Sequence, residues 1–189
     1  MPRYAALLRA INVGGRVVKM DVLRGHFESL GLAPAETFIA SGNVVFASRA
    51  RDAAALERRI EAQLRKTLGY EVATFLRDLD ELKAIAAREP FEGPAVAKAV
   101  AHYVAFLRER PDASAKKRVM ALCSPNDVFH LEGRELHVIS GLRFSESTFT
   151  GADLERALGA PATIRGMNTV RKMAEKFTSA GAAPAKKKS

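Results

Sequence analysis

The sequence predicts an α+β protein in which one order of strands and helices occurs twice. Apolar runs typical of strands alternate with amphipathic helical runs, and residues 89–94, which are rich in Pro and Gly, separate two segments with the same order. The chain has 189 residues, 48% of them hydrophobic, which is enough for one domain or two small ones around a real core. This composition excludes collagen-like, disordered and disulfide-scaffold classes.

The first half is expected to run strand, helix, strand, strand, helix, strand, helix. Residues 4–13 form an apolar run, and the following helix carries its apolar face at Met20, Leu23, Phe27 and Leu30. Residues 37–40 and 44–47 flank Ser41-Gly42-Asn43, in which the Gly-Asn pair favours the positive φ of a tight hairpin. The rest of this half comprises a helix capped by Asp52 and ending at Gly69, a strand over 71–77, and a helix opened by Asp78 and Glu81 at capping-box spacing.

The second half repeats this order. Its expected elements are a strand over 102–110, a helix over 111–122 opened by Asp112, a hairpin of 127–131 with 135–139 around Gly133-Arg134, a helix from Thr150 to Gly159, a strand over 162–165 and a last helix capped by Asn168. Two βαββαβ units predict a tandem duplication of ferredoxin-like units with antiparallel sheets. The expected divisions are 1–89 for the first unit, 90–100 for a link, 101–178 for the second unit and 179–189 for a disordered basic tail.

Charge and cysteine content indicate a cytoplasmic protein. The formal net charge is +9, and Lys186, Lys187 and Lys188 of the tail supply three of these charges. A basic balance favours attraction to phosphorylated ligands or nucleic acid. The only cysteine, Cys123, is expected at the apolar end of a helix and cannot form an internal disulfide. The apolar residues 4–8 are too few for a signal peptide or a membrane span, so no membrane partner is expected.

A glycine-containing loop is the first candidate binding segment. Gly14 and Gly15 precede a helix N-terminus, where backbone N–H groups favour an anion, and Arg9, Arg16 and Lys19 would add charge-assisted bonds. Asn12 would orient the ligand. The segment lacks the Gly-Lys-Ser/Thr of a Walker loop and the G-x-G-x-x-G fingerprint. A flexible loop with solvated basic side chains is the alternative.

Two further segments combine turn or cap chemistry with polar side chains. The first contains Ser41, Gly42 and Asn43, where a hairpin turn alone explains the glycine and Ser41 and Asn43 could face a ligand. The second contains Arg165, Asn168 and Thr169, where a strand end meets a helix start. An anion site and a simple helix cap both account for the second segment.

These three segments resemble the signatures of the family known as domain of unknown function 1697, in the same order. The resemblance covers essentially residues 3–178 and includes Leu8-Arg-x-Ile-Asn-Val-Gly-Gly15 and Ser41-Gly-Asn-Val-Val-Phe46. The third signature, Thr-x-Arg-Asn-x-Asn-Thr-Val, fits residues 163–170 except that Gly166 stands where the first Asn is expected. The resemblance implies a tandem ferredoxin-like fold, and it implies no activity.

The sequence provides no basis for assigning catalysis. A G-x-S-x-G nucleophile elbow is absent. If Gly133-Arg134 forms a two-residue turn, His130, Glu132, Glu135 and His137 share one face of the hairpin, opposite Phe129, Leu131, Leu136 and Val138. Those four polar side chains are candidate metal ligands, and the solvated face of a hairpin is the alternative. No cofactor is expected.

The conclusion from the sequence is a protein of unknown biological role that binds a small anionic or phosphate-bearing ligand. A single-stranded nucleic-acid-binding protein and a metal-dependent enzyme are the alternatives. Nucleic-acid binding would need exposed aromatic side chains on the sheets, and Phe38 and Phe46 are the strand aromatics weighed for this role and for the core. The sequence leaves the ligand's identity and the oligomeric state open.

Overall fold

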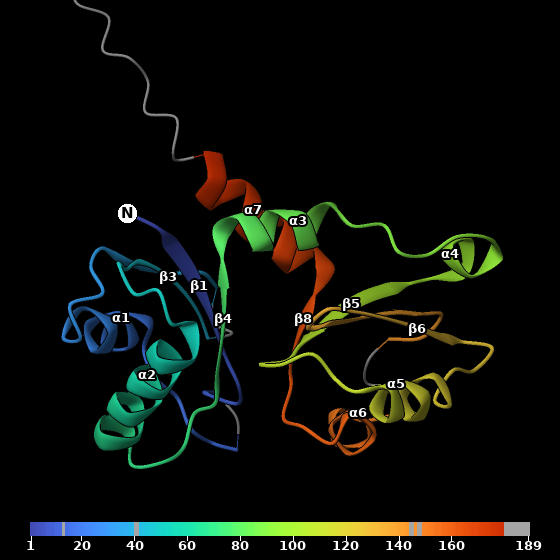
Figure 1. Cartoon of the computed structure of the whole chain (residues 1–189), viewed down its shortest axis with the longest axis horizontal. Coiled ribbons are helices and arrows are strands. Elements are labelled where there is room, and N and C mark those ends of the chain that lie inside the picture. The colour runs from blue at the N-terminus through green and yellow to red at the C-terminus, as the bar shows by residue number, and fades with distance from the viewer. Residues whose placement is uncertain (13, 40–41, 144–145, 147–148, 180–189) are drawn as a thin grey trace, which may run out of the picture.

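Two four-stranded antiparallel sheets, one from each half of the chain, organise the structure. The computed structural model describes residues 1–12, 14–39, 42–143, 146 and 149–179. The first half contains β1 (Arg3–Leu8), α1 (Met20–Glu28), β2 (Ala35–Thr37), β3 (Asn43–Ala47), α2 (Ala53–Leu68), β4 (Thr74–Asp78) and α3 (Leu79–Ala87) (Figure 1). The second half contains α4 (Pro94–Lys98), β5 (Ala101–Phe106), α5 (Ala113–Met120), β6 (Asp127–Glu132), β7 (Glu135–Ser140), α6 (Gly151–Leu158), β8 (Thr163–Gly166) and α7 (Met167–Ser179).

The strand orders are the same in the two halves. They are β2-β3-β1-β4 and β6-β7-β5-β8, and neighbouring strands in both sheets pair antiparallel. One face of the first sheet packs on α1 and α2 through a core that includes Phe27, Phe46 and Ile60. The second sheet packs on α5 and α6 through a matching core. The duplicated ferredoxin-like α+β fold expected from the sequence is confirmed.

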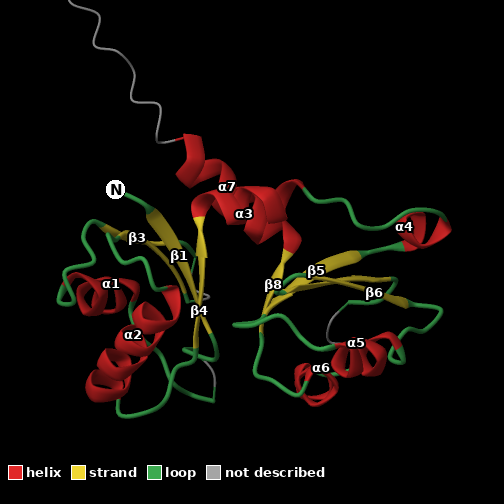
Figure 2. Cartoon of the chain, viewed as in Figure 1, coloured by secondary structure: helices red, strands yellow, loops and turns green. Residues whose placement is uncertain are grey.

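The remaining face of each sheet is covered within the same chain. A third core joins Phe75 of the first sheet to Phe106 of the second, with α3 and α7 packed over both. Figure 2 shows these two helices side by side above the junction. Apolar sheet faces must be buried, and here each half supplies part of the cover for the other.

Local capping signals in the sequence correspond to real helix starts. Asp52, Asp78, Asp112 and Thr150 each accept a hydrogen bond from a backbone N–H of the first helical turn, and Asp78 and Thr150 complete capping boxes. Because such bonds span only three residues, spacing along the chain is sufficient to predict them.

Several expected boundaries are wrong. The first strand ends at Leu8 because Ala10 has a φ of 57°, which breaks the extended chain. The second strand is Ala35–Thr37 rather than 37–40, and residue 40 lies outside the described residues. Asn168 is the second residue of α7 rather than its cap, since β8 runs directly into the helix. Cys123 follows α5 and is exposed, so it is not part of an apolar helix end.

The predicted tail from residue 180 onward lies outside the described residues. Within the described part of the chain, no helix combines the length and the apolar character needed to cross a membrane.

Candidate functional site

One buried guanidinium joins the end of β1 to the other two candidate segments. Arg165 of β8 is 8% exposed, and its Nε donates to Oδ1 of Asn43 at 2.7 Å. Its Nη2 donates to the carbonyl of Leu8 at 2.8 Å and more weakly to that of Gly42 at 3.5 Å. Its Nη1 donates to Thr163 Oγ1 and to the carbonyl of Ile164. The end of β1, the start of β3 and β8 therefore meet, and all the bonds use neutral oxygens.

The other half has an arginine in the corresponding place. Phe75 of β4 pairs with Leu7, as Thr163 of β8 pairs with Phe106, so Arg77 and Arg165 each lie two residues further along their strands. Arg77 is 1% exposed, and its Nη2 donates to the carbonyl of Leu107 at 2.8 Å. Each arginine thus reaches from its own half into the other.

The two arginines differ in their compensation by negative charge. The Nε of Arg77 donates to the Glu135 carboxylate at 2.7 Å, whereas Arg165 meets the neutral amide of Asn43 at the corresponding position. Burial lowers the pKa of Arg77, and Glu135 opposes that shift. Burial lowers the pKa of Arg165 to about 10, without an opposing carboxylate. Arg165 is therefore a cation at neutral pH, and among the described residues no carboxylate forms an ion pair with it.

A cavity of about 400 Å³ adjoins Arg165, and we call it the Arg9 cavity. It lies between the end of β1, the first turns of α6 and the start of β8, and its lining includes Arg9, Ala10, Gly151, Ala152, Glu155, Thr163 and Arg165. Arg9 is exposed at the rim and its Nη2 lies 2.8 Å from Glu155 Oε2. Glu155 Oε1 accepts from the backbone N–H of Ala162 at 2.9 Å. A cavity with both arginines and one carboxylate has a net positive lining.

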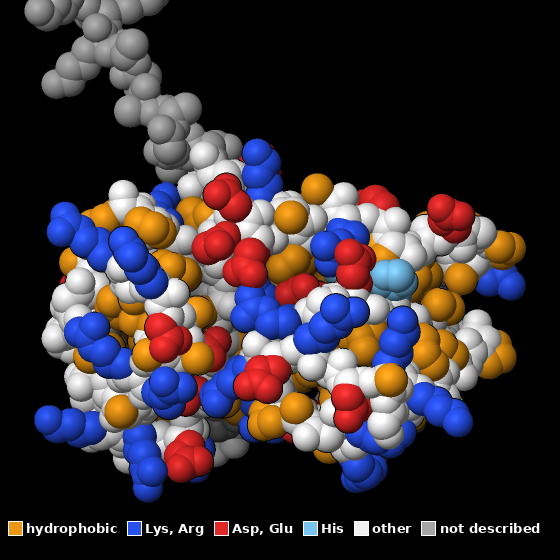
Figure 3. Space-filling model, in the orientation of Figure 1, with side chains coloured by type: hydrophobic (Ala, Val, Ile, Leu, Met, Phe, Trp, Pro, Cys, Tyr) orange, Lys and Arg blue, Asp and Glu red, His pale blue; other side chains and the backbone are white. Residues whose placement is uncertain are grey.

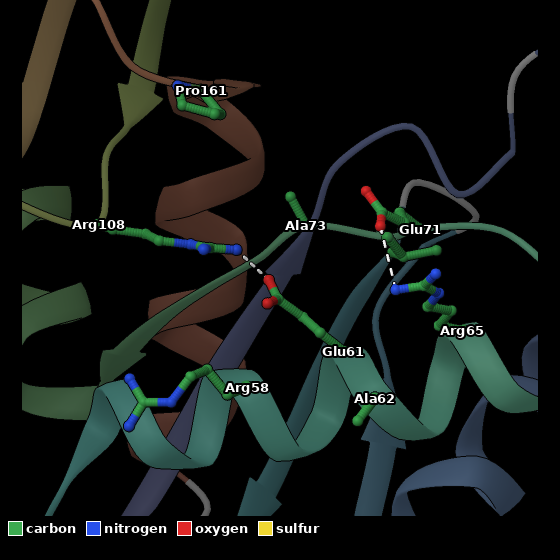
Figure 4. A pocket seen from close by; sticks show the side chains of 9 residues that line it. Arg58, Glu61, Ala62, Arg65, Glu71, Ala73, Arg108 and Pro161 are labelled. Carbon is green, nitrogen blue, oxygen red and sulfur yellow. Dashed lines mark hydrogen bonds and ion pairs between the residues drawn. The ribbon is translucent and has the colours of Figure 1, made fainter.

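The corresponding cavity of the other half, the Arg108 cavity, measures about 440 Å³ (Figure 4). Arg108 follows β5 as Arg9 follows β1, and it forms an ion pair with Glu61 of α2. Arg65 lies 3.4 Å from Glu71, whereas Arg58 forms no ion pair with the other residues drawn. Arg77 does not line this cavity, so the buried cation without a carboxylate belongs to the Arg9 cavity.

The glycine loop is a separate exposed feature. Asn12 Oδ1 accepts from the backbone N–H of Val18 at 2.7 Å, so this amide shapes the loop. The guanidinium of Arg16 lies 4.2 Å from the ring centre of Tyr70, and Lys19 is an N-cap residue without a side-chain cap bond. In the described part of the chain no hydrogen bond or ion pair joins Gly14, Gly15, Arg16 or Lys19 to Arg165. The same holds for Asn168 and Thr169, and Ser41 lies outside the described residues.

Gly42 is required by the packing of the β1 end. Its φ is 71°, and an added Cβ would lie 2.6 Å from Ile11 Cγ2 and 3.2 Å from Leu8 Cβ. Gly14 has a similar φ of 64° with no atom within 4 Å of an added Cβ. We expect Gly14→Ala to cost about 1 kcal/mol of unfolding free energy through backbone strain alone, and Gly42→Ala to cost about 1–3 kcal/mol more through overpacking.

Urea denaturation of the two glycine variants measures this difference directly. Equal losses for the two variants would show that the β1 end relaxes around the new methyl group.

The histidine hairpin has the expected register but a different environment. His130 pairs with His137 and Glu132 with Glu135, as a turn at Gly133-Arg134 predicts. The face is solvated at one end only: the side chains of His130 and Glu132 are 41% and 51% exposed, whereas Glu135 binds Arg77 and His137 is fully buried. The described residues contain no group of three or more His, Cys, Asp or Glu side chains placed to hold a metal ion. Of the four candidate ligands, Glu135 is paired with Arg77 and His130 lies 3.5 Å from Glu132.

Arg77, Arg108 and Glu155 were not identified from the sequence as site residues. A signal was present for Arg77, because an arginine follows Phe75-Leu76 in the fourth strand of the first repeat as Arg165 follows Thr163-Ile164 in the second. A residue-by-residue alignment of the two repeats would have paired them.

The fold places this chain in the class of tandem ferredoxin-like α+β proteins, and in this chain buried guanidinium groups join the two halves. The chain belongs to the family described as "Protein of unknown function (DUF1697)", which matches residues 1–137, so the segment at 163–171 lies beyond that match. A solved structure of a conserved bacterial protein from Streptococcus pneumoniae is similar, with a TM-score of 0.72 and 24% identity over 94% of this chain and 99% of that one. It supports the fold alone. No curated protein matches the chain.

Proposed function

We propose that this protein binds a small phosphate-bearing anion in the Arg9 cavity. The observation that carries the proposal is the contrast between two equivalent buried arginines. Arg77 has a carboxylate partner, whereas Arg165, which lines the cavity, has only neutral partners. A bound anion would supply the missing negative charge from the open side. Electrostatic attraction is strong there because Arg165 is shielded from water.

The other groups at the cavity have complementary roles in this proposal. Arg9 releases Glu155 and binds the ligand through charge-assisted hydrogen bonds. The backbone N–H groups of Gly151 and Ala152 have no acceptor among the described residues, and they lie at the positive end of α6. Asn43 and Gly42 hold Arg165 in place, and the loop from Gly14 to Lys19 adds exposed positive charge beyond the end of β1.

Two observations favour a small ligand over single-stranded nucleic acid. Phe46 is buried in the core of the first half and Phe38 packs against the third core, so neither offers a stacking platform. Figure 3 shows basic and acidic side chains interspersed over the visible face rather than a continuous basic track.

Calorimetric titration with pyrophosphate tests the proposal with a matched pair of variants. We expect Arg9→Gln to weaken binding about tenfold or more, since one charge-assisted hydrogen bond contributes about 1.5–3 kcal/mol. Arg108→Gln changes the equivalent residue of the other half, which has a similar exposure, and should leave the affinity unchanged. Equal losses in both variants would indicate unspecific attraction and contradict the proposed site.

Asn43→Asp tests the role of the uncompensated charge. The new carboxylate faces Arg165 as Glu135 faces Arg77, so it should compete with the ligand and weaken pyrophosphate binding while the chain stays folded. Unchanged affinity in a folded Asn43→Asp protein would mean that Arg165 does not attract the anion.

A further inference from the structure

A smaller cavity lies on the second half, under the link that follows α3. We call it the His102 cavity; it measures about 280 Å³. Phe91 of the link, Val100 and Ile139 contribute apolar surface, and His102, Arg171 and Glu89 contribute polar groups. His102 alternates in register with Val104 and Phe106 of β5, so it lies on the sheet face that carries the third core. The cavity thus opens beside the junction of the halves, away from the Arg9 cavity, with which it shares no lining residue.

The charged pair at this cavity is exposed and exchangeable. Arg171 Nη2 lies 2.5 Å from Glu89 Oε1, and their side chains are 41% and 74% exposed. Arg171 Nε also donates to the carbonyl of Ala86 at 3.4 Å, which anchors the guanidinium to the end of α3. An exposed ion pair contributes little to stability, so another carboxylate can replace Glu89 at small cost.

The surroundings of the histidine at the cavity favour its neutral form. His102 Nε2 lies 3.4 Å from Nδ1 of His137. The rings of Phe91 and His102 meet edge to face, with 5.6 Å between their centres. Burial and the nearby Arg171 lower the pKa of His102, while Glu89 opposes the shift. With Nε2 directed at His137, a neutral His102 has Nδ1 left for a further hydrogen bond.

We propose that the His102 cavity binds a small monocarboxylate with an apolar body. The carboxylate takes the place of Glu89 on Arg171, His102 lies beside it, and the apolar body packs against Phe91, Val100 and Ile139. One cation and one neutral imidazole match a single negative charge, and the apolar walls disfavour a doubly charged phosphate. Ligand pockets commonly combine apolar walls with a few placed polar groups, and this volume restricts the ligand to a small molecule.

Titration of the full chain with hexanoate, acetate and inorganic phosphate tests this inference. Wild-type protein should bind hexanoate more tightly than acetate, because only hexanoate reaches the apolar wall, and phosphate should not displace it. Glu89→Gln should tighten hexanoate binding about two- to fivefold, the gain expected from freeing Arg171 from an exposed ion pair, and Arg171→Gln should weaken it at least tenfold. Glu92→Gln removes a nearby carboxylate that does not line the cavity and serves as the control for net charge.

Three results would overturn the inference: no gain in Glu89→Gln, the same gain in Glu92→Gln, or equal affinity for acetate and hexanoate. Circular dichroism and thermal unfolding of each variant separate lost binding from lost structure. Arg9→Gln should leave hexanoate binding unchanged, so failure here and failure of the pyrophosphate site are distinguishable.

Discussion

Replacing Arg77 by methionine is expected to lower the free energy of unfolding by about 3–5 kcal/mol, the usual cost of breaking a buried ion pair by removing one partner. The guanidinium of Arg77 bonds Glu135 and the carbonyls of Leu76, Leu107 and Arg134. The variant therefore leaves the Glu135 carboxylate and several carbonyl groups without this donor at the junction of the halves. Urea denaturation at neutral pH, with m-values compared, measures the loss.

The double variant Arg77→Met with Glu135→Leu is the control for this prediction. Removing both charges leaves no unpaired ion, so most of the lost stability should return even though the polar link between the halves is gone. A double variant as unstable as Arg77→Met would show instead that the carbonyl contacts of Arg77, rather than its pairing with Glu135, carry the stability.

Acidification from pH 6.5 to pH 5 is expected to destabilise the protein by about 2 kcal/mol through His137 alone. Burial, followed by the nearby His102, Arg88 and His130, lowers the pKa of His137 from 6.5 to about 3. The unfolded chain takes up a proton near pH 6.5 and the folded chain only near pH 3. The contribution of neutral, buried His137 to the free energy of unfolding is therefore complete above pH 6.5. It is lost as the pH falls from 6.5 towards 3.

The charges around His137 determine how this prediction is checked. Arg88 bonds Glu132, and His130 lies 3.5 Å from the same carboxylate, so Glu132 partly balances the cluster from β6. On the other side, Arg171 and Glu89 face His102. His137→Leu should flatten the dependence of the urea midpoint between pH 7 and pH 5, while His26→Gln, a change on α1 outside the cluster, should retain it. A wild-type midpoint that is constant over this range would contradict the burial of His137.

The two halves are joined by reciprocal contacts as well as by the third core. Arg9 pairs with Glu155 of the second half, and Arg108 pairs with Glu61 of the first. Each glutamate also accepts a backbone N–H at the start of the fourth strand of its own half, from Ala162 and from Thr74. Because each half completes the other's hydrogen bonds and apolar cover, we expect the halves to unfold together.

Local chemistry explains which parts of the fold were predictable. The Asp78 and Thr150 caps depend on bonds between residues three positions apart, and the register of His130 with His137 follows from the turn and strand alternation. The second strand was misplaced because the connection before Asn43 is longer than a two-residue turn, and Asn43 is already part of β3. Spacing along the chain does not reveal such a connection.

By itself, the sequence determined the element order, the duplication, the main helix starts and three segments with residues suited to an anion. Only the tertiary structure decided that Leu8, Asn43 and Arg165 meet, because Arg165 and Asn43 are 122 positions apart in the chain. It also decided that Glu135 and His137 are buried rather than solvated, since the other half covers their sheet face. Burial and the presence of a counter-charge depend on such distant neighbours, which is why the unbalanced charge of Arg165 became visible only in the folded chain.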